Sequence, residues 1–213
     1  MRLSIALVAL FAAVVVGPFA VRAQGDGLRR SLTDSELRRL ERGRLVTRRT
    51  SERRGELLLI GGTSYQVIDL APDEVWRAVS DRPRYLRQML PQTQRMRELR
   101  HTETTRTMRV RHEYGIVSAT YAVTFSYDAD AKTVIFRLAN DRPRDLRAGW
   151  GFIKLRPWGD NGEQTLVSFG MMADVGTGII SGALRPTLHE WMLKVPWTMK
   201  QYLEGSGRSR YER

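Results

Sequence analysis

The chain has 213 residues, with 35 Lys and Arg against 23 Asp and Glu, which gives a formal net charge of +12. Hydrophobic residues make up 42% of it, and it contains no cysteine. This composition excludes a wholly disordered chain, a small disulfide-stapled domain and a cysteine-ligated metal site. The length fits one domain, or one domain with a short extension.

The positive charge comes almost entirely from arginine, because only 4 of the 35 basic residues are lysine. Arginine favours bidentate contacts with phosphates and carboxylates. The composition therefore raises the question of an anionic partner. It does not answer that question, since an arginine-rich genome produces the same bias.

Residues 1–23 have the order of a secretory signal peptide. A basic start at Arg2 is followed by an apolar run over residues 5–16 and then by Gly17-Pro18. We expect cleavage after Ala23 and export to the periplasm or the exterior of a bacterial cell. An uncleaved membrane anchor is the alternative, but the apolar run of 12 residues is shorter than the roughly 20 needed to span a bilayer.

Residues 24–54 are predicted to form a basic extension with a short helix and an edge strand. Ten arginines and four acids occur within residues 28–54. Thr33 and Glu36 have the spacing of a capping box, and Gly43 is a typical helix stop. Two interpretations stay open, an arm that binds anionic headgroups or cell-wall polymer and a solvated surface with outward charges. No aromatic residue lies between these arginines to stack on bases, and an exported protein does not meet cellular nucleic acid. We therefore expect no nucleic-acid partner.

Residues 55–204 are predicted to form one α+β domain. A helix opens at Ala71-Pro72-Asp73-Glu74, with proline early and acids in its first turn, and a second short helix fits residues 83–90. Strands are predicted at residues 57–60, 65–70, 95–101, 107–117, 119–127, 133–138, 147–155 and 164–171. The short turns between the later strands indicate hairpins and hence an antiparallel sheet.

The C-terminal part of the chain is predicted to be helical. Residues 184–203 have the pattern of one long amphipathic helix, in which Pro196 should produce a kink. Residues 205–213 are polar and basic, and we expect them to form a disordered tail.

Three motifs lie close together in the first half of the domain. They are Ala71-Pro72-Asp73-Glu74-Val75-Trp76, then Asp81-Arg82-Pro83-Arg84-Tyr85, and finally Leu90-Pro91. Together with the order of elements, they resemble the START-like (SRPBCC) superfamily, in particular its polyketide cyclase/dehydrase and coenzyme Q-binding branch. The resemblance covers about residues 31–204. It implies a helix-grip fold, in which a curved antiparallel sheet wraps around a long C-terminal helix and two short helices follow the first strand.

A helix-grip fold implies a ligand cavity between the sheet and the terminal helix. Its candidate ligand-binding residues are the aromatic and large apolar residues of both layers. The strands supply Tyr114, Tyr121, Val123, Phe125, Phe136, Trp150, Phe152 and Met171, and the terminal region supplies Leu184, Leu188, Trp191, Met192 and Val195. Strand alternation divides the first group into two faces, and the sequence leaves open which face meets the helix. For any single residue, an ordinary core position is the simpler interpretation.

His112 and Tyr114 are the candidates for catalysis. Two residues apart on one predicted strand, they share a face. On a concave face they would be placed to polarise a carbonyl in a cyclisation or dehydration, whereas on a convex face His112 would lie among surface charges. The three histidines lack metal-ligand spacing and no glycine-rich phosphate loop is present, so we expect no metal and no cofactor.

The leading hypothesis is an exported, non-enzymatic protein that binds or carries a hydrophobic small molecule such as a lipid, isoprenoid or polyketide. Two alternatives stay open. One is a cyclase or dehydratase that uses His112 and Tyr114. The other is a peripheral protein that docks on an anionic membrane through its arginine-rich surface.

Overall fold

The computed structural model describes residues 31–114, 117–176 and 185–212. The segment expected to be a signal peptide lies outside these ranges. Residues Asp34–Arg213 make up one compact unit. Within the part of the chain that is described, no helix is long and apolar enough to cross a membrane.

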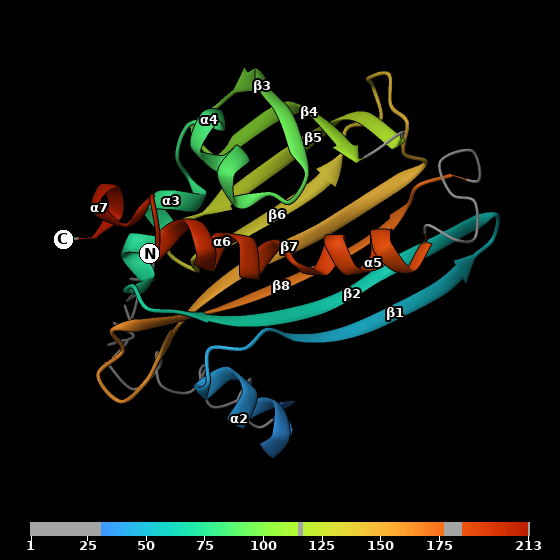
Figure 1. The fold of residues 1–213 in the computed structure, drawn as a ribbon. Coiled ribbons are helices and arrows are strands. Elements are labelled where there is room, and N and C mark those ends of the chain that lie inside the picture. The colour runs from blue at the N-terminus through green and yellow to red at the C-terminus, as the bar shows by residue number, and fades with distance from the viewer. Residues whose placement is uncertain (1–30, 115–116, 177–184, 213) are drawn as a thin grey trace, which may run out of the picture. The chain divides into compact units, whose positions relative to one another are not determined.

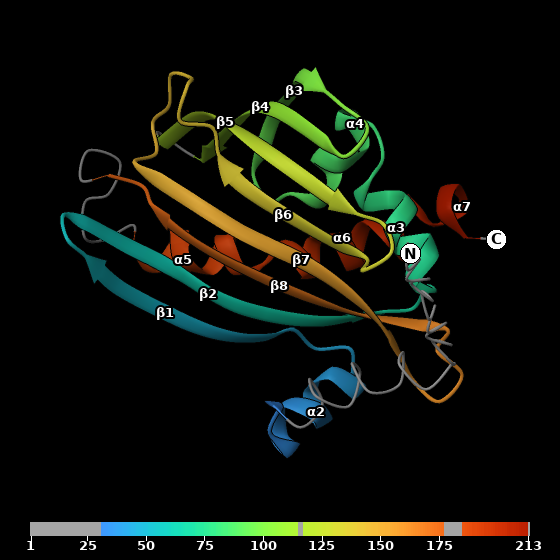
Figure 2. The same cartoon turned by 180° about the vertical axis from the view of Figure 1, so that it is seen from behind.

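Among these residues, eight antiparallel strands form a single curved sheet (Figure 1 and Figure 2). The strands are β1 (Val46–Arg54), β2 (Leu57–Ile68), β3 (Thr93–His101), β4 (Thr105–Tyr114), β5 (Val117–Asp128), β6 (Thr133–Leu138), β7 (Ala148–Trp158) and β8 (Gln164–Asp174). Their order across the sheet is β1-β2-β8-β7-β6-β5-β4-β3. Apart from the pair β2 and β8, neighbours in the sheet are neighbours in the sequence, because hairpin turns join them.

Helices flank the sheet at several points of the chain. They are α2 (Asp34–Glu41), α3 (Pro72–Val79), α4 (Pro83–Leu86) with the 3-10 turn η1 (Arg87–Met89), α5 (Arg185–Leu193), α6 (Val195–Leu203) and α7 (Arg208–Tyr211). The start of α3 agrees with the sequence prediction. The carboxylate of Glu74 accepts a hydrogen bond from the backbone amide of Ala71 at 3.0 Å, which satisfies one of the free donors at a helix start.

The C-terminal helix is broken, which differs from the single long helix expected over residues 184–203. Helix α5 ends at Leu193 and α6 begins at Val195, and each has nine residues. Pro196 lies in the first turn of α6. Because proline lacks an amide hydrogen and its ring clashes with the preceding turn, it is disfavoured inside a helix and fits the first turn of a new one. Both short helices lie across the concave face of the sheet, where they contact β2 and β8 (Figure 1).

The main core lies between the concave face and the helices. Cross-strand partners share a face, so Phe169 of β8, Ile153 of β7 and Val134 of β6 form a continuous row. This row packs with Met199 and Leu203 of α6 in one buried cluster. Burying such apolar surface contributes about 25 cal/mol per Å² to the stability of the folded chain.

Two adjacent glycines join the two strands predicted at residues 57–60 and 65–70 into the single strand β2. Gly61 and Gly62 have φ angles of +156° and +134°. A Cβ atom on Gly61 would lie 1.9 Å from the carbonyl oxygen of Met171, and one on Gly62 would lie 2.0 Å from that of Arg48. The backbone of β2 therefore approaches both neighbouring strands more closely than any residue with a side chain would allow.

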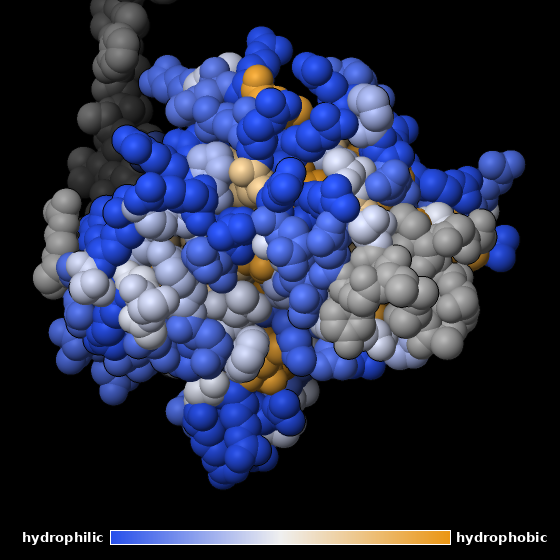
Figure 3. Space-filling view, turned by 45° about the horizontal axis from the view of Figure 1, so that its top comes forward, coloured by the Kyte–Doolittle hydropathy of each residue, from blue (hydrophilic) through white to orange (hydrophobic). Residues whose placement is uncertain are grey.

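Every residue of β1 pairs with a residue of β2, so residues 46–54 form an edge strand of the sheet. These residues, predicted as part of the basic extension, thus belong to the same sheet as the strands of the domain predicted over residues 55–204. Most β1 side chains are exposed. Arg48, which is half-buried, forms an ion pair of 2.6 Å with Glu36 of α2. On the face shown in Figure 3, hydrophilic residues dominate and hydrophobic ones are visible only in small separate patches.

The C-terminal residues, which we expected to be disordered, are ordered by contacts with the domain. Tyr211 of α7 is only 3% exposed. Its hydroxyl donates to Oδ2 of Asp81 at 2.8 Å, and Nε of Arg210 donates to the same oxygen at 2.9 Å. A buried aromatic ring with its hydroxyl paired supplies packing that a polar tail would lack.

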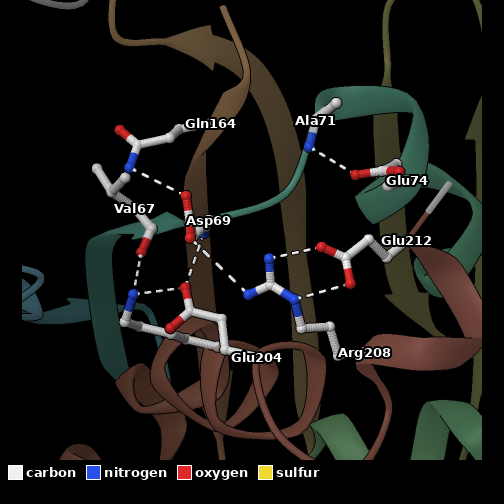
Figure 4. Close-up of polar contacts among 9 residues, drawn as sticks. Val67, Asp69, Ala71, Glu74, Gln164, Glu204, Arg208 and Glu212 are labelled. Carbon is white, nitrogen blue, oxygen red and sulfur yellow. Dashed lines mark hydrogen bonds and ion pairs between the residues drawn. The ribbon is translucent and has the colours of Figure 1, made fainter.

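A second set of polar contacts ties the end of α6 to the end of β2 (Figure 4). Oε1 of Glu204 accepts from the backbone amide of Asp69 at 2.7 Å and from Nζ of Lys200 at 2.6 Å. Arg208 lies 3.8 Å from Asp69 and pairs with Glu212 at 2.7 Å. These contacts hold the C-terminal helices against one end of the sheet.

Candidate functional site

A cavity of about 190 Å³ lies between the concave face of the sheet and the helices α5 and α6. Most of the side chains around it are aliphatic or aromatic. The predicted residues that line it are Tyr121, Val123, Phe125, Phe136, Trp150, Met171, Leu188, Trp191, Met192 and Val195. The structure thus gathers residues from β5, β6, β7, β8, α5 and α6 around one space.

Phe152 does not line this cavity, which corrects the expectation from sequence. Its cross-strand partner is Gly170, and the Phe152 ring lies so close that a Cβ atom on Gly170 would be 2.4 Å from ring atom Cε1. In contrast, Gly151 and Ile153 pair with the cavity-facing residues of β8. Because side chains alternate along a strand, Phe152 points to the outer face. Trp150, two residues earlier, shares the parity of Phe152 although it borders the cavity. The structure does not describe the side chain of Tyr114. Leu184 lies outside the described residues altogether.

Sequence reasoning missed part of the cavity wall. The additional lining residues are Leu90, Pro91, Gln92, Val110, Glu113, Ala119, Leu138, Leu146, Gly149, Ile153, Phe169, Ala173 and Val175. Several of them share the strand parity of residues already proposed, such as Phe169 and Ala173 beside Met171. The period of two would have found them once one face was fixed, whereas the loop after η1 carries no such signal.

His112 faces the cavity, and the partner of its imidazole is Tyr121. Strands β4 and β5 pair so that His112 lies opposite Ala119, which puts Tyr121 on the diagonal. Nε2 of His112 is 2.8 Å from the hydroxyl oxygen of Tyr121. The two rings stack with centroids 5.6 Å apart and an interplanar angle of 21°. The polar pair in the cavity is therefore His112 with Tyr121, where the sequence indicated His112 with Tyr114.

Burial favours the neutral forms of both residues. Desolvation lowers the pKa of His112, although hydrogen bonds to the backbone of Pro91 and Gln92 oppose this shift. Desolvation also raises the pKa of Tyr121. At neutral pH the pair thus brings hydrogen-bonding atoms to the cavity without a net charge.

The other two histidines have local roles. Nε2 of His189, a buried residue of α5, donates to the carbonyl oxygen of Gly61 and so ties the helix to β2. His101 lies at the end of β3, 3.7 Å from Glu98. Within the described ranges, no group of three or more His, Asp and Glu side chains is placed to hold a metal ion.

No protein-family model and no curated protein matches the chain. Solved structures do match. TTHA0849 from Thermus thermophilus is 16% identical with a TM-score of 0.58, over 70% of this chain and 97% of that one. A STAR-related lipid transfer protein (fragment 25–204) from Xanthomonas axonopodis is 16% identical with a TM-score of 0.56, over 73% and 98%. Zhui aromatase/cyclase from Streptomyces sp. R1128 is 11% identical with a TM-score of 0.51, over 70% and 98%.

These likenesses define the fold. The chain has the α+β fold of START-like (SRPBCC) proteins, and its described residues form an antiparallel sheet of eight strands with C-terminal helices on the concave face. Proteins of this fold include both a lipid transfer protein and a cyclase, so the fold is compatible with either kind of activity.

Proposed function

We propose that this chain is an exported protein that binds or carries a hydrophobic small molecule in the cavity without transforming it. The observation that supports this best is the cavity itself, about 190 Å³ in volume and lined mainly by apolar side chains. Transfer of apolar surface from water into such a space is favourable by about 25 cal/mol per Å². Met171 and Met192 add flexible, polarisable wall that adapts to different shapes. Export rests on the sequence of residues 1–23.

The volume narrows the class of ligand. An apolar cavity of roughly 150 Å³ holds a benzene molecule. The space described here therefore suits one or two fused rings, or a short segment of an acyl or isoprenoid chain. A longer lipid would have to extend beyond the cavity.

Native mass spectrometry of protein purified from a bacterial periplasm tests this function. We expect a co-purifying apolar molecule that is released on denaturation. We also expect the melting temperature to rise when stripped protein is mixed with bicyclic or short-chain apolar probes. Protein that carries no ligand and whose melting temperature responds to none of these probes would contradict the proposal.

A cyclase or dehydratase is the second candidate, favoured by one observation. The pair His112 and Tyr121 lies in the cavity wall, beside any molecule bound there. A titratable group next to a bound substrate is the basic requirement for general acid–base catalysis. Turnover of a polyketide-type substrate that is lost in both His112→Ala and Tyr121→Phe would support this candidate, and intact turnover in both would exclude it.

A basic groove on the outside supports membrane docking as an additional property. Arg39, Arg44, Arg49 and Lys194 line it together with Trp197, which is 43% exposed, and Glu190, which pairs with Lys194 at 2.6 Å. Indole rings favour the boundary between water and lipid, and nearby cations are attracted to anionic headgroups. We infer that this groove is the surface through which the protein approaches an anionic membrane.

A further inference from the structure

The hydrogen bonds of His112 fix the position of its proton. Nδ1 lies 3.2 Å from the carbonyl oxygen of Pro91 and 3.2 Å from Oγ1 of Thr93. A carbonyl oxygen can only accept, so an unprotonated Nδ1 would set two lone pairs against each other. Oγ1 of Thr93 lies 3.3 Å from the same carbonyl, to which it can donate while it accepts from Nδ1. The proton of the neutral ring is therefore on Nδ1.

This assignment determines what the Tyr121 hydroxyl does. With the ring proton on Nδ1, Nε2 of His112 has a lone pair and needs a donor. The hydroxyl of Tyr121, 2.8 Å away, supplies it. A phenolic hydroxyl has one proton, so once that proton is directed to His112, the Tyr121 oxygen presents only lone pairs to a bound molecule.

Trp191 and Trp150 also border the cavity and each carries an indole N–H donor, so the acceptor polarity argued here is that of the Tyr121 hydroxyl and not of the whole wall. Glu113 follows His112 on β4, so its side chain points to the opposite face of the sheet, where it pairs with Arg111 at 2.5 Å. Gln92 is exposed, and it belongs to the loop after η1.

We propose that the cavity selects apolar molecules that donate a hydrogen bond, such as alcohols, phenols or ring N–H compounds, over molecules of the same shape that only accept one, such as ketones. This inference rests on the proposed function, because it concerns the same cavity and names the chemistry of the ligand's polar end. The selecting atom is the Tyr121 hydroxyl oxygen, and His112 acts through it as a positioning residue.

Two probes of equal size separate the alternatives. 1-Indanol and 1-indanone share one bicyclic frame and differ in an alcohol against a ketone. Calorimetric titration gives a Kd for each probe, and the ratio of the 1-indanone Kd to the 1-indanol Kd measures the preference for the alcohol. We expect this ratio to be about 3- to 10-fold larger in wild type than in Tyr121→Phe. The Phe variant keeps the ring and removes the acceptor, so it supplies the baseline preference.

In His112→Leu we expect the preference between the two probes to shift toward the ketone. A merely structural role of His112 would not produce this shift. Without Nε2, the Tyr121 hydroxyl is free to donate, so the affinity for 1-indanone should rise relative to that for 1-indanol. Tyr127→Phe is the matched control. Tyr127 lies on the same strand but does not line the cavity, and its loss should leave the wild-type ratio unchanged.

The outcomes distinguish this inference from the proposed function. If wild type and Tyr121→Phe bind both probes with the same ratio, the inference is overturned and the binding function stands. If wild type binds neither probe, both fall together. Should His112→Leu not fold, as judged by circular dichroism, the comparison of wild type with Tyr121→Phe still decides the matter.

Discussion

The hydroxyl of Tyr121 lies 2.8 Å from Nε2 of His112, on the neighbouring strand of the same sheet face. This bond joins β4 to β5 inside a wall that is otherwise mainly apolar. A buried hydrogen bond of this kind stabilises the fold only modestly, whereas an unpaired partner would be costly. The pair therefore acts as a unit in stability, and we propose that it does so in ligand binding as well.

The free energy of unfolding should fall as the pH is lowered through about 6.5, because folded His112 resists protonation. Burial lowers the pKa of His112, so the unfolded chain, with a histidine pKa near 6.5, takes up this proton first. Above about pH 7 both states hold a neutral ring and the effect vanishes. Urea unfolding at about pH 7.5 and about pH 5 should show a larger fall for wild type than for His112→Gln. Equal falls would argue against a buried, neutral His112.

Filling the cavity should abolish ligand binding. Met171→Trp places a larger side chain in the wall of a cavity of about 190 Å³, with a cost in stability of roughly 1–3 kcal/mol from overpacking. Phe152→Trp is the matched control, since Phe152 lies on the outer face of the adjacent strand. Titration with 1-indanol should show binding lost in the first variant and kept in the second. Retained binding in Met171→Trp would mean that the ligand occupies another place.

Gly61→Ala should destabilise the sheet strongly. Its Cβ atom would lie 1.9 Å from the Met171 carbonyl oxygen, so β2 and β8 would have to separate locally. We expect the free energy of unfolding to fall by roughly 3 kcal/mol or more. Gly55→Ala, at a turn with φ of +57° and no atom within 4 Å of the new Cβ, should cost only about 1–2 kcal/mol. A similar loss in both variants would show that the close strand approach is unimportant.

Tyr211→Phe should lower the free energy of unfolding by about 1 kcal/mol, because it removes the hydrogen bond to Asp81. Tyr211→Ala also removes the buried ring and should cost roughly 3 kcal/mol. Limited proteolysis should then cut the C-terminal residues faster in the Ala variant. If neither unfolding nor proteolysis changes, α7 does not contribute to the fold.

Binding to vesicles should depend on the basic groove. Trp197→Ala and Lys194→Glu should each weaken sedimentation with vesicles that contain phosphatidylglycerol, and raising the salt should weaken it for wild type as well. Ile135→Ala is the control, since Ile135 is 47% exposed on β6 but does not line this groove. Binding that is indifferent to salt and to lipid charge would contradict docking through this groove.

Much of the fold follows from local sequence patterns. Strand β6 occupies the predicted residues 133–138, and α3 begins where proline and two acids mark a helix start. Alternation, turn residues and capping act over a few residues, so they can be recognised without knowing the rest of the molecule. The motifs around Trp76 and Tyr85 indicated the START-like fold through their resemblance to that family.

The sequence by itself determined the kinds of side chains available to a cavity, but only the tertiary structure decided which of them meet. Register across β7 and β8 placed Phe152 outside, and register across β4 and β5 gave His112 the partner Tyr121. From the sequence, Pro196 indicated a kink in one long helix, whereas in the structure α5 and α6 are two separate helices that pack on the sheet. Tyr211 is ordered because Asp81, 130 residues earlier, lies beside it in the fold. These outcomes depend on contacts between distant residues, and no pattern within a short stretch of sequence records them.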